Sequence, residues 1–131
     1  MDLKKQYGTD KALEENGVWQ DIGDGASVLV ARMGNSRNVL ELKRLTAPHK
    51  RQIQLGKLDD EIWKKINIEA IADSILLDWK GVEINGKELP YSKPNAIQVL
   101  TDYADFRDVI STLANDMANY QNQEKEAAIK N

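Results

Sequence analysis

In some stretches of the chain the apolar residues recur at a helical period, and in others at the shorter period of a strand. Apolar residues recur at helical spacing in three stretches: 36–45, 59–77 and 105–123. Such spacing is typical of helices that bury one face. Two shorter runs, 18–22 and 26–32, hold apolar and β-branched residues on either side of Gly23-Asp24-Gly25. These runs predict an N-terminal β-hairpin.

A second short hairpin is predicted around Asn85-Gly86. Val82–Ile84 and Lys87–Leu89 flank this pair, and a type I′ turn needs positive φ at both of its central residues. Ser92 then stands where it can cap a short helix that begins near Pro94. We therefore expect an α+β fold, mostly helical, with two hairpins.

The helix boundaries follow from capping residues and proline. Ser36 is the predicted cap of the first long helix, and Pro48 predicts a kink or restart at 47–49. Asp59-Asp60-Glu61 suits the start of the 59–77 helix because acidic side chains favour the positive end of a helix dipole. The wide apolar surface of the 59–77 helix predicts a central position and leaves part of its face for a partner groove.

Length and composition indicate one soluble domain over residues 1–131. Of the 131 residues, 41% are hydrophobic and 30% charged, which is ordinary for a globular protein. We expect residues 1–16 and 124–131 to be loosely ordered because both ends are polar. No apolar run approaches the roughly 18 residues of a membrane span, so we expect no membrane contact.

Charge is unevenly distributed although the net charge is only −3. The stretch Arg32–Lys57 is strongly basic, and the last third of the chain is acidic. The basic stretch is compatible with a solvated helix, a protein contact, head-to-tail self-association or nucleic acid. Nucleic acid is the least favoured partner because aromatic residues do not interleave with these basic residues and the net charge is negative.

Candidate chemistry is sparse. His49 is the only histidine and there is no cysteine, so neither a catalytic pair nor a thiolate metal site can be drawn from the sequence. Gly23 and Gly25 lack the third glycine of a dinucleotide fingerprint. We expect a non-enzyme without cofactor or metal.

Exposed aromatic, apolar and basic side chains are the remaining candidates for a partner surface. The predicted partner-binding residues are Trp79, Tyr91, Ile62, Trp63, Ile66, Arg37, Lys43 and Arg44.

Four sequence blocks resemble the tail assembly chaperones of long-tailed bacteriophages. They are the GVWQDIGD start (17–24), the LDWKG and PYSKPN blocks (77–95) and the DFR helix start (105–107). The resemblance spans about residue 3 to the C-terminus, and its motifs are structural rather than catalytic.

The resemblance implies a protein of the infected bacterial cytoplasm that is absent from the mature virion. Such chaperones coat and solubilise the helical tape measure protein and are displaced as tail tube protein polymerises. A longer form, often made by ribosomal frameshifting, recruits the tube protein. From the basic and acidic ends of this chain we expect weak, concentration-dependent self-association. The alternatives are a small structural tail or head–tail connector component, and a nucleic-acid-binding regulator.

Overall fold

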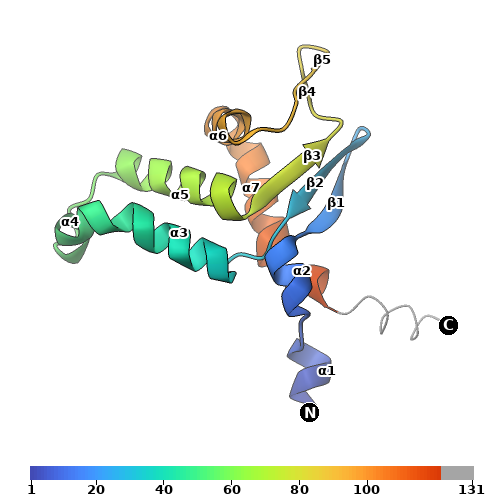
Figure 1. Ribbon diagram of the computed structural model, residues 1–131, viewed down its shortest axis with the longest axis horizontal. Coiled ribbons are helices and arrows are strands. Elements are labelled where there is room, and N and C mark those ends of the chain that lie inside the picture. The colour runs from blue at the N-terminus through green and yellow to red at the C-terminus, as the bar shows by residue number, and fades with distance from the viewer. Residues whose placement is uncertain (122–131) are drawn as a thin grey trace.

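The computed structural model describes residues 1–121 as helices packed on a small sheet (Figure 1). In chain order the elements are α1 (Leu3–Tyr7), α2 (Lys11–Asn16), β1 (Val18–Gly23), β2 (Ala26–Val30), α3 (Ser36–Thr46), the 3₁₀ turn η1 (Ala47–His49), α4 (Lys50–Gln54), α5 (Asp60–Ser74), β3 (Leu76–Lys80), β4 (Glu83–Ile84), β5 (Lys87–Glu88), α6 (Lys93–Asp102), α7 (Ala104–Asn115) and the 3₁₀ turn η2 (Met117–Tyr120). The predicted α+β class, mostly helical with two hairpins, is confirmed.

The main sheet is antiparallel with strand order β1-β2-β3. Val28 and Val30 on the central strand β2 are fully buried. Strand β3 was not predicted, because Ile75–Trp79 continues the apolar run of the preceding helix. The helix instead ends at Ser74, three residues before the predicted end at Leu77, and β3 pairs with β2.

Helix α5 is central, as predicted. It packs between α3 and α6 and against β3. Helix α7 lies behind the three-stranded sheet in the view of Figure 1 and contacts β2. The core is formed where these helices meet the sheet, with Ile75, Leu76, Leu100 and Ile110 fully buried.

The last helix is shorter than predicted. It was expected to reach Gln123 but ends at Asn115, and Asp116 is extended with φ −86° and ψ 107°. The chain restarts as η2, capped by the Asp116 side chain. This break turns Tyr120 into the core, where its hydroxyl donates to the Val30 carbonyl at 3.1 Å.

Part of the N-terminal segment, residues 1–16, is attached to the body of the protein through α2. The Asp10 amide donates to the Tyr120 carbonyl at 2.7 Å. In α2, Glu14 is buried, where it accepts from Thr9 and pairs with Arg32. Helix α1 has no buried residue. Residues 124–131 lie outside the described part of the chain.

Proline, turn and capping residues lie at the break, the turn and the helix start that the sequence predicted. Pro48 lies in η1, between α3 and α4. Asn85 and Gly86 have φ of 54° and 76°, as a type I′ turn requires. Ser92 caps α6 by accepting from the Asn95 amide at 3.1 Å.

The cap of α3 is Asn35 rather than the predicted Ser36. The Asn35 Oδ1 accepts from the Asn38 amide at 3.0 Å, while Nδ2 donates to the carbonyls of Arg32 and Ser74 at 2.8 and 3.0 Å. Ser36 donates instead to the Glu15 carboxylate at 2.7 Å. Asn35 is 4% exposed, so it joins the start of α3 to the end of α5 inside the protein.

We predict that Asn35→Ala lowers the free energy of unfolding by about 2–3 kcal/mol, through a lost cap and a buried carbonyl left without its donor. Ser36→Ala is the matched control and should cost only about 0.5 kcal/mol, because it removes an exposed contact. Urea unfolding of the two variants measures both values. Equal costs would contradict this assignment of the cap.

Candidate functional site

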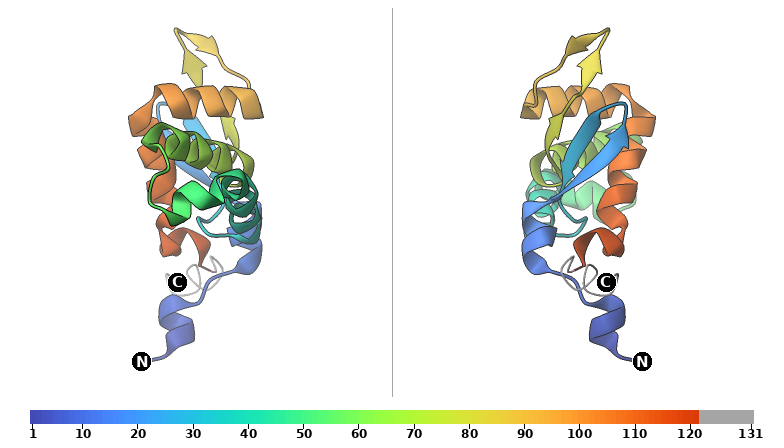
Figure 2. Two further views of the ribbon diagram at one scale, coloured as in Figure 1. Left: turned by 90° about the vertical axis from the view of Figure 1, so that its left-hand side faces the viewer. Right: turned by 90° about the vertical axis from the view of Figure 1, so that its right-hand side faces the viewer.

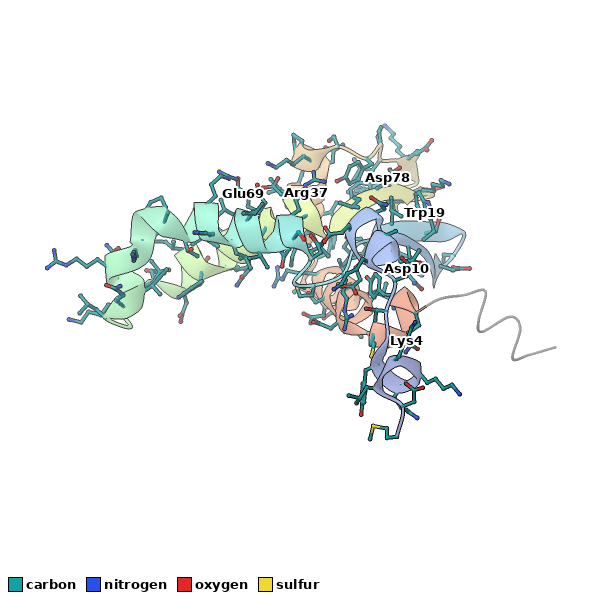
Figure 3. All side chains as sticks on the ribbon, turned by 60° about the horizontal axis from the view of Figure 1, so that its bottom comes forward. Lys4, Asp10, Trp19, Arg37, Glu69 and Asp78 are labelled. Atoms are coloured by element: carbon teal, nitrogen blue, oxygen red, sulfur yellow. The ribbon has the colours of Figure 1, made fainter. Side chains whose placement is uncertain are left out.

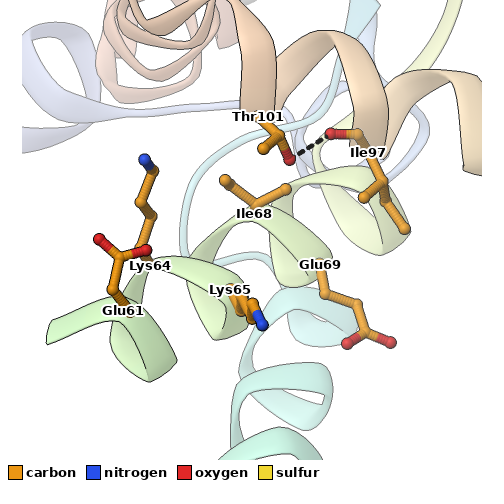
Figure 4. Close-up of a pocket in the computed structure, with 7 residues that line it drawn as sticks. All are labelled: Glu61, Lys64, Lys65, Ile68, Glu69, Ile97 and Thr101. Carbon is orange, nitrogen blue, oxygen red and sulfur yellow. Dashed lines mark hydrogen bonds between the residues drawn. The ribbon is translucent and has the colours of Figure 1, made fainter. Parts of the chain in front are cut away.

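Helix α5 leaves one stripe open to solvent, next to α6. Residues 61, 64, 65 and 68 are spaced three and four apart, so they share one helix face. Together with residues of α6 they line a groove of about 340 Å³ between the two helices. Figure 4 shows this surface, which we call the α5–α6 groove.

The floor of the α5–α6 groove is aliphatic. Ile68 lies at the bottom and is 3% exposed, while Ile97 is half-buried beside it. The Thr101 hydroxyl donates to the Ile97 carbonyl at 2.7 Å (Figure 4). Thr101 therefore brings no unpaired polar group to the floor.

The rim of the α5–α6 groove carries charges of both signs. Its charged residues are Glu61, Lys64, Lys65 and Glu69. An aliphatic floor bordered on the α5 side by charges of both signs suits an amphipathic helix, whose apolar stripe is flanked by charged side chains.

A cluster of charged side chains holds α3, α5 and α6 together beside this groove. Arg44 Nη2 on α3 lies 2.8 Å from Glu41 Oε2 and 3.6 Å from Asp73 Oδ2 on α5. Lys93 at the start of α6 pairs with Asp73 Oδ1. The Asp73–Lys93 pair thus ties the two walls of the groove to each other.

Asp73 is the least hydrated member of this charged cluster. Its side chain is 9% exposed, and Oδ2 has no hydrogen-bond partner within residues 1–121. Burial raises the pKa of Asp73 above its ordinary value, although Lys93 lowers it. The hydrogen bond from Arg44 instead lowers the pKa of Glu41.

Two of the predicted partner residues, Trp79 and Tyr91, contact each other inside the protein. Their rings meet edge to face with centroids 5.1 Å apart. The Trp79 Nε1 donates to the Leu89 carbonyl at 2.8 Å, and the Tyr91 hydroxyl donates to the Leu76 carbonyl at 2.7 Å. Trp79 is 5% exposed and Tyr91 is half-buried, so this pair fastens the second hairpin to β3.

The predicted residues of α5 lie on a different side from the groove. Ile66 is 5% exposed, and Ile62 and Trp63 are half-buried. Ile62 and Ile66 share a stripe with Asp73, which approaches Arg44 of α3. The open part of α5 is therefore its Glu61–Lys65 side, with Ile68 buried beneath it. The adjacent lysines 64 and 65 are the sequence signal that marks it.

The predicted basic residues divide into two kinds. Arg37 and Lys43 are exposed on α3. Arg44 is also exposed, but its guanidinium is engaged by the acidic residues of the charged cluster. The basic stretch is thus partly neutralised by α5.

A second groove lies at the far end of the molecule, between the β4–β5 hairpin and the α6–α7 junction. It encloses about 470 Å³. Its apolar lining consists of Val82, Ile84, Val99, Tyr103 and Phe106, and its polar lining of Glu83, Asn85 and Asp105. We call it the hairpin groove.

The comparison with protein families decides the origin of the chain. Residues 33–131, most of the 131-residue sequence, match the family described as YdaY prophage protein. The chain belongs to the YdaY prophage protein family. This YdaY-family protein is therefore phage-derived. No curated protein and no solved structure matches the chain.

Both grooves of this YdaY-family protein lie within the matched residues, whereas α1, α2 and the first hairpin precede them. Over residues 1–121, no helix has the length and apolar character needed to cross a membrane. The same residues contain no group of three or more His, Cys, Asp or Glu side chains arranged to hold a metal ion.

We predict that Lys93→Met lowers the free energy of unfolding by about 1 kcal/mol at pH 7, because Asp73 loses its closest cation. Lys93 favours ionised Asp73, so its contribution is present above the folded-state pKa of Asp73, which burial raises above the ordinary value, and it is lost as pH falls through that folded-state pKa. The difference in the free energy of unfolding between Lys93→Met and the wild type should therefore shrink near pH 4. Urea unfolding at the two pH values measures it.

Lys57→Met is the matched control because Lys57 is exposed and makes no ion pair with residues 1–121. It should change stability little at either pH. A deficit for Lys93→Met that is the same at both pH values would contradict the role given to Asp73.

Proposed function

We propose that this YdaY-family protein is a non-catalytic tail assembly chaperone that binds amphipathic helical segments of the tape measure protein in its α5–α6 groove. The observation that carries the proposal is the aliphatic floor of Ile68 and Ile97 beside charges of both signs on α5. A long helix held by many copies of such a groove stays soluble because its apolar stripe is covered.

The prophage origin and the sequence blocks that resemble tail assembly chaperones support the same function. In this proposal the protein acts in the cytoplasm of the infected host and leaves the tape measure protein when tail tube protein polymerises. Contact with the tube protein belongs to a frameshift-extended form. The competing function is that of a small structural tail or head–tail connector component, which would remain in the virion.

We predict that co-expression with the tape measure protein of the same prophage keeps the tape measure protein soluble and allows the two to co-purify. Thr101→Arg should weaken capture about tenfold, equivalent to about 1.4 kcal/mol, because a charged side chain then enters the aliphatic groove. A pull-down with titrated competitor measures this change.

The matched control for that pull-down is Gln98→Arg. Gln98 is exposed on the same helix but does not line the groove. It adds the same charge, so capture should be unchanged. A tape measure protein that gains neither solubility nor a partner contradicts the chaperone proposal. Finding the chain in purified virions favours the structural-component alternative.

A further inference from the structure

Helix α1 stands apart from the body of the protein and exposes apolar residues. Leu3 and Tyr7, one helical turn apart, are 68% and 59% exposed. Within residues 1–121, the side-chain contact that holds α1 to another element is a hydrogen bond from Gln121 Nε2 to the Gln6 carbonyl at 3.3 Å. Clustered exposed apolar side chains of this kind mark contact surfaces.

The charged residues of α1 are basic. Lys4 and Lys5 lie between the two apolar residues, and both are exposed. The nearest acid, Asp2, turns its carboxylate onto the amides of Lys4 and Lys5 to cap the helix. Figure 3 marks Lys4 on α1, beyond α2 and the sheet. The helix thus offers an apolar stripe flanked by ammonium groups.

The hairpin groove has the opposite character. Its charged lining residues are Glu83 and Asp105, both exposed carboxylates. Tyr103 and Phe106 give it an aromatic wall. Its volume of about 470 Å³ falls within the range of sites that take side-chain-sized groups. An apolar, acidic groove complements an apolar, basic helix.

Helix α1 cannot enter the hairpin groove of its own chain. The β4–β5 hairpin and α1 lie at opposite ends of the molecule (Figures 1 and 2). The hydrogen bond from the Asp10 amide to the Tyr120 carbonyl holds the root of α1 at its own end. The helix that fills the groove must therefore come from another molecule.

We infer that α1 of one copy docks in the hairpin groove of a second copy of this chain. Leu3 and Tyr7 enter between Ile84 and Tyr103, while the two lysines face Glu83 and Asp105. The contact joins different surfaces of the two copies, so it propagates head to tail instead of closing on a two-fold axis. It is independent of the α5–α6 groove and of the function proposed for it.

Charge reversal tests this contact without touching the core. The arm variant Lys4→Glu/Lys5→Glu and the groove variant Glu83→Lys/Asp105→Lys change only exposed residues. Sedimentation velocity at low salt, from about 10 μM to about 1 mM, covers the range in which a weak contact becomes populated. We expect the average mass of the wild type to rise with concentration, each double variant to remain monomeric, and the four-fold variant to recover association.

Lys50→Glu/Arg51→Glu on α4 is the matched control because it makes the same change of charge in the basic stretch. It should associate like the wild type. A wild-type protein that stays monomeric throughout overturns the inference, as does an arm variant that associates normally. Loss of association in the α4 control alone would assign the contact to the basic stretch, and a four-fold variant that stays monomeric would contradict direct pairing of these charges.

Discussion

The fold depends on the segment that leaves β2, because its backbone joins three elements that are distant in sequence. Three successive amides donate to three different carbonyls at 2.9 Å: Ala31 to Ile75, Arg32 to Glu14 and Met33 to Ala114. Asn35 adds a side-chain hydrogen bond to the Ser74 carbonyl. Because buried peptide groups need partners, the positions of α2, α5 and α7 are fixed by one short stretch.

This constraint carries through to the α5–α6 groove. The end of α5 is held by Ala31 at Ile75, and α6 is tied to α5 through Asp73 and Lys93. The two walls therefore keep a fixed separation around the aliphatic floor, and a preformed site loses less conformational freedom when it binds a helix. Within residues 1–121, helix α1 has no comparable support, which leaves its apolar residues available for another molecule.

Local rules predicted the features that local chemistry decides: the turn at Asn85-Gly86, the break at Pro48 and the cap at Ser92. They did not predict β3, because the apolar residues of Ile75–Trp79 continue the pattern of the preceding helix. Pairing with β2 makes this segment a strand instead. The sequence predicted a groove on this helix but not the side on which it lies, for a similar reason. Composition shows that α5 is apolar on several sides, but only the packing of α3 and α6 decides which side stays open.

The most direct test of the proposed chaperone role is hydrogen–deuterium exchange of this protein alone and in complex with the tape measure protein. Helix amides exchange through local opening, so a bound helix should slow exchange in residues 61–69 and 97–101, which line the α5–α6 groove. Unchanged exchange in both segments of a formed complex would contradict the account.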